Sequence, residues 1–275
     1  MADAILALTA AQTGIWYGQQ IHPDSPMYNA GEYVELHGNL DVPQLAEALR
    51  LLVSEADTLR AHILDDGDTP VLGIHREVPV DLTTYDMTDS PSPLRDAVEH
   101  MRGRLRHPVN LRTEPPFEYA VYRLGERYWA FFYRYHHIGV DGYSVALLTQ
   151  RIAEIYSQLC NDGRVSPSPF ERLAALVDAD AAYRRSEQCQ QDADYWRAEI
   201  AAAGTPATLG RIPNGLPGAL LRVSDVVEAE TVTLLKERAR KAEVIWPSLV
   251  FSSVALYLHE MTGSAQPVLG LPVTG

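Results

Sequence analysis

Two aromatic-rich runs separated by three residues constrain the fold of this 275-residue chain more than any other feature. The runs Tyr119–Leu124 and Tyr128–Tyr135 flank the short segment Gly125-Glu126-Arg127. Aromatic residues favour the half-buried surface of a sheet, and a three-residue connection that contains glycine suits a β-hairpin. The pattern therefore predicts an antiparallel pair of strands in the middle of the chain, around which a sheet can form.

The segment HHIGVDG, from His136 to Gly142, follows the second run directly. Adjacent residues of a strand point to opposite faces, so only one of His136 and His137 can face a given cleft. Side chains at the end of a strand are held by a rigid sheet, which suits catalytic groups. Asp141 stands where a helix is expected to begin, so it can cap that helix or pair with a buried cation. Gly142 leaves room for a substrate or a backbone to approach closely.

Helical patterns surround this hairpin. Thr9 and Gln12 form a capping box, which predicts a short helix near the N-terminus. Residues 41–59 carry an N-cap, an early proline and apolar residues at a helical period. Residues 145–159 repeat that period directly after the histidine segment. Helices mixed with strands predict an α/β fold around a mixed sheet.

Composition and charge exclude several classes of protein. The formal net charge is −13, which disfavours nucleic acid as a partner. Cys160 and Cys189 are the two cysteines, too few for a secreted disulfide scaffold or a thiolate zinc site. The sequence shows neither a signal peptide nor an apolar run of about 20 residues, so we expect a cytoplasmic protein without a membrane span. A metal site at His136, His137 and Asp141 is a competing interpretation, but adjacent strand residues diverge.

Four segments together resemble one family. HHIGVDG resembles the HHxxxDG signature of nonribosomal peptide synthetase condensation domains and of the wider chloramphenicol-acetyltransferase-like acyltransferases. Leu8–Trp16 (LTAAQTGIW) is similar to the opening motif of condensation domains, and Glu55–Ala61 (EADTLRA) is similar to their second motif. The region from Tyr183 to Trp196 resembles the helices that follow the boundary between their two lobes. The segments occur in the family's order and span essentially the whole chain.

This resemblance implies a fold and a domain organisation. The expected fold is the chloramphenicol-acetyltransferase-like two-layer α/β sandwich with a mixed sheet and helices, two-lobed in the complete domain. Residues 1–168 are expected to form the N-terminal lobe with the active-site motif. Residues 169–275 are expected to form the lobe linker and a partial C-terminal lobe, because the later motifs of the second lobe are missing. The linker candidate Ser166-Pro167-Ser168-Pro169 lies at this boundary.

The resemblance also implies a role for each residue of the motif. His137, the second histidine, is expected to be catalytic, while His136 supports the loop. Asp141 is expected to be structural and to form an ion pair with Arg60 of the second motif. Gly142 is expected to line the approach to the active site.

The implied activity is condensation, an amide-bond-forming acyl transfer in antibiotic and other secondary metabolism. The donor and acceptor would be thioesters on the phosphopantetheine arms of carrier proteins, with downstream synthetase domains as further partners. No directly bound cofactor, metal, nucleic acid or membrane is expected. Two alternatives from the same superfamily stay open, a stand-alone CoA-dependent acyltransferase and an epimerisation domain. A condensation-like module that binds carriers without catalysis is the alternative from another class.

Overall fold

The computed structural model describes residues 2–66, 69–203, 208–210 and 225–271. Contacts within the chain divide it into two compact units, with the division between Arg185 and Ser186. The predicted lobe boundary near residue 168 lies inside the first unit, because the following helix, α5 (Leu173–Arg184), packs on strand β1 (Ala4–Ala7) of that unit. The lobes of the complete domain therefore remain a prediction, and each compact unit is described by itself.

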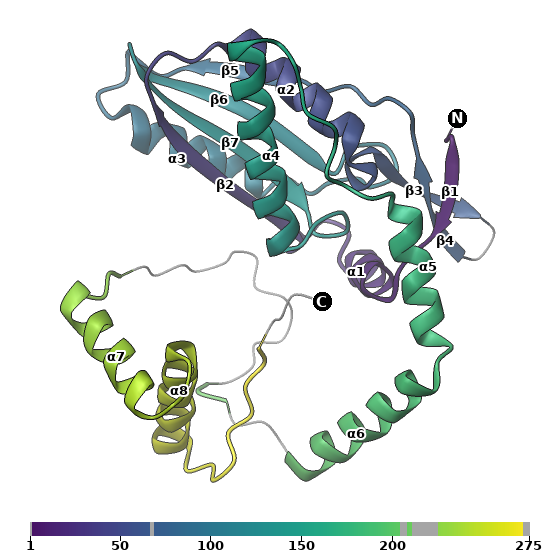
Figure 1. The fold of residues 1–275 in the computed structure, drawn as a ribbon, viewed down its shortest axis with the longest axis vertical. Helices are drawn as coiled ribbons and strands as arrows, with labels where there is room; N and C mark the ends of the chain where they lie inside the picture. The colour runs from purple at the N-terminus through teal and green to yellow at the C-terminus, as the bar shows by residue number, and fades with distance from the viewer. Residues whose placement is uncertain (1, 67–68, 204–207, 211–224, 272–275) are drawn as a thin grey trace. The chain divides into compact units, whose positions relative to one another are not determined.

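A four-stranded mixed sheet forms the centre of the first unit (Figure 1). The predicted hairpin is confirmed as β6 (Phe117–Gly125) and β7 (Tyr128–His136), which pair antiparallel. On the outer side of β7 lies β2 (Asn29–His37), also antiparallel. On the outer side of β6 lies β5 (Leu82–Asp86), which runs parallel to it. The strand order β2-β7-β6-β5 places β7, and the histidines at its end, in the interior of the sheet.

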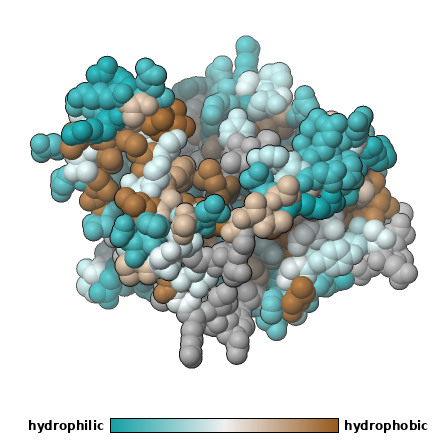
Figure 2. All heavy atoms as spheres, turned by 90° about the horizontal axis from the view of Figure 1, so that it is seen from below, coloured by the Kyte–Doolittle hydropathy of each residue, from teal (hydrophilic) through white to brown (hydrophobic). Residues whose placement is uncertain are grey.

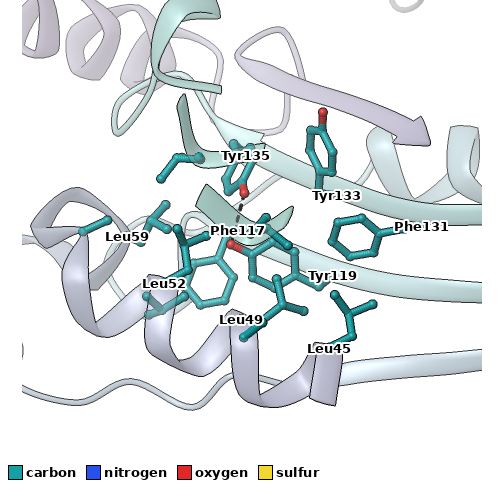
Figure 3. Packing of buried hydrophobic residues seen from close by; sticks show 14 of the residues in the cluster. Leu45, Leu49, Leu52, Leu59, Phe117, Tyr119, Phe131, Tyr133 and Tyr135 are labelled. Atoms are coloured by element: carbon teal, nitrogen blue, oxygen red, sulfur yellow. Dashed lines mark hydrogen bonds between the residues drawn. The ribbon is translucent and has the colours of Figure 1, made fainter. Parts of the chain in front are cut away.

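Helices α2 (Val42–Glu55) and α4 (Gly142–Asn161) cover one face of this sheet (Figure 1). Both helices were predicted from the period of their apolar residues, which become the buried stripe. Figure 3 shows leucines of α2 packed against aromatic side chains of β6 and β7. The labelled members of this cluster are Leu45, Leu49, Leu52, Leu59, Phe117, Tyr119, Phe131, Tyr133 and Tyr135.

Helix α3 (Pro93–Leu105) covers the opposite face of the sheet (Figure 1). Its Ala97 and Met101 are buried against strand residues that point away from α2 and α4. Because side chains alternate along β7, Phe132 faces α3 whereas Phe131 faces α2 and α4. The same alternation decides the directions of the two histidines that follow.

A second, three-stranded antiparallel sheet has the order β1-β4-β3. It consists of β1 (Ala4–Ala7), β3 (Ala61–Asp66) and β4 (Thr69–Ile74). The short 3-10 helix η1 (Asp57–Arg60) leads from α2 into β3. The predicted capping box is present at the start of α1 (Ala10–Ile21), and α5 (Leu173–Arg184) contacts β1. Apolar residues of this sheet, α1, α5 and the loop after β7 share one buried cluster.

The second unit contains α6 (Glu187–Ala203), α7 (Ala229–Lys241) and α8 (Trp246–Thr262). Its large apolar side chains are exposed along α8, and Figure 2 shows brown, apolar side chains at the surface among hydrophilic ones. No single described helix is long and apolar enough to cross a bilayer. Taken together, α7 and α8 have the length and composition of a membrane span, but the two helices meet at an angle of 99°. The described residues 225–228 and 263–271, before α7 and after α8, form neither helix nor strand.

Candidate functional site

The candidate site is the loop His137–Asp141, which joins the end of β7 to the start of α4. Backbone hydrogen bonds continue beyond the last strand residue: the His136 N–H donates to the Pro116 carbonyl at 2.9 Å. The His137 N–H donates to the Tyr28 carbonyl at 2.8 Å. The backbone of both histidines is therefore fixed from two sides, as a rigid mount for a functional group requires.

His137 is half-buried and directly follows β7, where the alternation of side chains directs it toward the face that carries Tyr133 and Tyr135. Its Nδ1 lies 3.1 Å from the carbonyl oxygen of Val140. A carbonyl oxygen can only accept a hydrogen bond, so Nδ1 carries the proton and donates. In the neutral imidazole, Nε2 then keeps a lone pair that can accept a proton from a substrate.

His136 points to the opposite face and is almost completely buried, with 1% of its surface exposed. Its Nδ1 accepts the Ile138 N–H at 3.1 Å, so its proton resides on Nε2, which donates to Gln19 Oε1 at 3.3 Å. Burial, followed by the charges of His137 and Arg134, lowers the pKa of His136 from 6.5 to about 4. His136 is thus neutral at pH 7, and both of its ring nitrogens are engaged in hydrogen bonds; its supporting role stays a prediction.

Asp141 caps α4, one of the two roles open to it from the sequence. Its Oδ1 accepts hydrogen bonds from the Ser144 N–H at 2.7 Å and from the Ser144 hydroxyl at 2.6 Å. These bonds favour the ionised carboxylate and lower its pKa. Next to it, a Cβ at Gly142 would meet no atom within 4 Å, so the start of α4 is open.

The expected ion pair between Arg60 and Asp141 is not formed in the part of the chain that the structure describes. Arg60 pairs instead with Asp57 at 2.6 Å, three residues earlier in η1, where successive turns bring positions i and i+3 together. Arg60 also donates to the carbonyls of Val53 and His75, at 3.0 and 2.5 Å. The second oxygen of Asp57 accepts the N–H of the first residue of α5 at 3.0 Å. Through Asp57, the second motif is therefore hydrogen-bonded to the start of α5.

Two glutamines of α1 contact the site, and sequence reasoning did not assign them a role there. Gln12 donates from Nε2 to the Ile138 carbonyl at 3.1 Å, and Gln19 accepts from His136. Gln12 was predicted to complete the capping box and lies within the motif Leu8–Trp16, but a hydrogen bond to a loop 126 residues away leaves no local sequence pattern. Gly139 is also close-packed, because a Cβ there would lie 3.3 Å from the Thr58 carbonyl oxygen.

The competing metal site does not gain support from this geometry. Both ring nitrogens of His136 are engaged, and Nδ1 of His137 donates to Val140. Within the described residues, no group of three or more His, Cys, Asp or Glu side chains is arranged to hold a metal ion.

Comparison with known proteins places the chain among synthetase sequences. Residues 2–275 match a family model described as Condensation domain. A dimodular nonribosomal peptide synthase of Bacillus subtilis (strain 168) is 34% identical over 273 residues, covering 99% of this chain and 12% of that protein. An isonitrile lipopeptide synthase of Streptomyces coeruleorubidus is 36% identical over 280 residues, covering 98% of this chain and 18% of that protein.

Solved structures give the same result. The starter condensation domain of rhizomide synthetase, a mutant in complex with C8-CoA and Leu-SNAC, matches with a TM-score of 0.89 at 34% identity. That match covers 98% of this chain and 61% of the solved one. The first condensation domain of the calcium-dependent antibiotic synthetase, in complex with a substrate analogue, matches with a TM-score of 0.86 at 28% identity. The chain thus spans less than two thirds of the proteins it resembles.

Proposed function

The chain belongs to the condensation domain family, and from this premise we propose that it supplies His137 to an amide-bond-forming acyl transfer in nonribosomal peptide biosynthesis. Its fold is the chloramphenicol-acetyltransferase-like α/β fold of that family. The proposed organisation keeps residues 1–168 as the N-terminal lobe and 169–275 as the linker and part of the second lobe. The observation that carries the proposal is the hydrogen bond from His137 Nδ1 to Val140 O, which leaves Nε2 as an acceptor.

In the proposed reaction, the α-amine of an aminoacyl acceptor attacks the carbonyl carbon of a donor thioester. A C–N bond forms, the C–S bond breaks through a tetrahedral intermediate, and the thiol leaves with a proton. His137 Nε2 accepts the proton of the attacking amine, a contribution typically worth about 10²–10⁴-fold in rate. Holding amine and thioester together adds a separate contribution, because it replaces an encounter of two molecules by a fixed geometry.

Asp141, His136 and Gly142 complete this proposed site without touching the transferred proton. Asp141 fixes the first turn of α4 through its hydrogen bonds to Ser144, which also lower the pKa of its carboxylate. His136 holds the loop from behind through the Ile138 N–H. Gly142 leaves open space at the start of α4, which suits the approach of a thioester arm.

Condensation domains act on substrates carried by the phosphopantetheine of carrier domains, so donor and acceptor carriers and adjacent synthetase domains are the proposed partners. The cytoplasm is the proposed location. We further propose that the donor carries a fatty acyl group such as octanoyl. Two similarities support this: one relative is named a lipopeptide synthase, and a starter condensation domain was solved with C8-CoA.

A condensation assay tests the proposal. An octanoyl thioester, on CoA or on a carrier, would be mixed with a carrier-bound aminoacyl acceptor, and products read by intact-protein mass spectrometry. The enzymes compared are this chain, a form extended through the second lobe, and His137→Ala in each. His37→Ala is the matched control, since this exposed histidine lies on β2 at the register of Tyr128, the opposite end of β7 from His137.

The proposal expects amide product from the extended form, reduced about 10²–10⁴-fold in His137→Ala and unchanged in His37→Ala. Acyl transfer from the CoA thioester, with no reaction of any carrier-bound substrate, would instead indicate a stand-alone acyltransferase. Inversion of the acceptor's α-carbon without acyl transfer would indicate an epimerisation domain. Carrier binding without turnover in any form would indicate a recruiting module.

A further inference from the structure

Helix α1 presents two buried glutamines to the loop that carries His137. Gln12 and Gln19 are 8% and 5% exposed. They are separated by seven residues, close to two turns of helix, so they share one face of α1. A buried amide costs free energy unless its donors and acceptors are satisfied, and both amides meet groups at the end of β7.

The orientation of the Gln12 amide is fixed at its oxygen. Gln12 Oε1 accepts the Thr9 N–H at 3.0 Å, as the last partner of the capping box. Its Nε2 therefore points the other way and donates to the Ile138 carbonyl at 3.1 Å. The start of α1 and the loop after β7 are joined through this one side chain.

The orientation of the Gln19 amide is fixed at its nitrogen. Gln19 Nε2 lies within 2.9–3.1 Å of three backbone carbonyls in the turn after α1, those of His22, Pro23 and Ser25. Since carbonyls only accept, the Oε1 of Gln19 faces His136 Nε2 and accepts its proton. That choice leaves His136 Nδ1 as the acceptor for the Ile138 N–H.

We propose that Gln12 and Gln19 are positioning residues that fix the C=O and the N–H of Ile138 from one helix, and through that residue orient the imidazole of His137. Ile138 lies between His137 and Val140, whose carbonyl accepts the His137 Nδ1–H. A rotation of Ile138 would displace that carbonyl and release the ring. The catalytic meaning of this inference rests on the proposed function, whereas the geometric arrangement is tested independently of it.

The first test reads the imidazole tautomers by two-bond ¹H–¹⁵N correlation spectra of the ¹⁵N-labelled chain. We expect His137 as the Nδ1–H form and His136 as the Nε2–H form. Gln12→Glu keeps an acceptor for Thr9 but cannot donate to Ile138, so the His137 signals should move toward a mixture of tautomers. Gln20→Glu is the matched control, because Gln20 is exposed on the same helix and should leave both histidines unchanged.

The exchange rate of the Ile138 amide hydrogen is a second test of the same geometry. It can be measured in the unsubstituted chain, so it does not depend on whether a Gln12 variant folds. In the unsubstituted chain, the Ile138 amide should exchange at least about 10-fold more slowly than an unprotected loop amide. Gln19→Met should raise that rate toward the unprotected value, whereas Gln20→Met should not. An unprotected Ile138 amide, or His137 signals that ignore both Gln12→Glu and Gln19→Met, would overturn the inference.

The kinetic test uses the form extended through the second lobe. A misplacement of a catalytic group by about 1 Å can cost about 10²-fold, so Gln12→Glu should lower kcat by that order with little change in KM. An unchanged kcat, or a loss confined to KM, would contradict the positioning role. If the unsubstituted enzyme shows no acyl transfer while the tautomers behave as expected, the proposed function fails and the positioning geometry stands.

Discussion

The two faces of the four-stranded sheet differ in the polar groups that its strands bury beside the adjacent histidines. On the face covered by α3, Arg134 and Glu118 form an ion pair at 3.0 Å, and Arg104 joins Glu118 at 2.6 Å. On the face covered by α2 and α4, the strands contribute tyrosine hydroxyls, with Tyr119 and Tyr135 3.1 Å apart (Figure 3). The strands therefore bury charged groups on the first face and neutral hydroxyls on the second.

The tyrosine hydroxyls are neutral at pH 7, and desolvation raises the pKa of Tyr133 further, to about 12, and that of Tyr119 well above its ordinary value. The charges of the first face anchor the backbone instead: Arg134 donates to the carbonyls of Arg104 and His107, at 2.9 and 3.0 Å. The two faces therefore differ in function. Charged groups hold the end of α3 behind the sheet, while His137 lies on the face where the strands bury no charge.

The largest expected effect on stability is the difference between a Glu→Gln substitution on the charged face and the same substitution on the other face. Glu118→Gln leaves Arg134, whose side chain is 6% exposed, without its carboxylate, which should cost about 3–5 kcal/mol of unfolding free energy. Glu32→Gln removes an exposed carboxylate on the other face, where the amide oxygen still accepts from Tyr133, so the cost should stay below about 1 kcal/mol. Urea unfolding at pH 7 measures both. Equal losses would remove the distinction between the faces.

The pH dependence of stability should come next. The folded pKa of His136 is lowered to about 4 from 6.5, so the unfolded chain binds its proton first. The associated stability is complete above pH 6.5 and is lost as the pH falls toward 4, by about 3 kcal/mol at about 1.4 kcal/mol per pKa unit. Unfolding free energies measured from pH 7 to 4 should therefore fall more steeply for the natural chain than for His136→Gln. Parallel curves would show that burial of His136 does not couple to folding.

The smallest effect concerns Asp141 and distinguishes a cap from an ion pair. Asp141→Ala removes the cap of α4 and should cost about 1 kcal/mol, whereas Asp141→Asn keeps an acceptor for Ser144 and should cost less. Because Arg60 pairs with Asp57, Arg60→Met and Asp141→Asn should be additive within about 0.5 kcal/mol in a double-mutant cycle. A coupling well above that value would restore the expected Arg60–Asp141 pair. The cycle of Arg60 with Asp57 provides the positive control.

Much of this site could be predicted because its signals are local. The hairpin, the helix after it and the cap at Asp141 each depend on residues within a few positions of one another. The opposite directions of His136 and His137 follow from the alternation of a strand alone, and in the structure the two rings have different partners, Gln19 and Val140. Strand β3 was not predicted, because Ala61–Asp66 becomes a strand only through its pairing with β4.

The chemical groups at the end of β7 and the divergence of the two histidines can be predicted from sequence, because side chains alternate along a strand over a few residues. The partners of the long-range contacts come from packing: Gln19 for His136 and Gln12 for Ile138. Buried polar groups require hydrogen-bond partners, but the sequence contains several polar residues that could serve as the partner of each one. The choice among them is made by the packing of α1, η1 and the two sheets, which brings residues more than a hundred positions apart within hydrogen-bond distance.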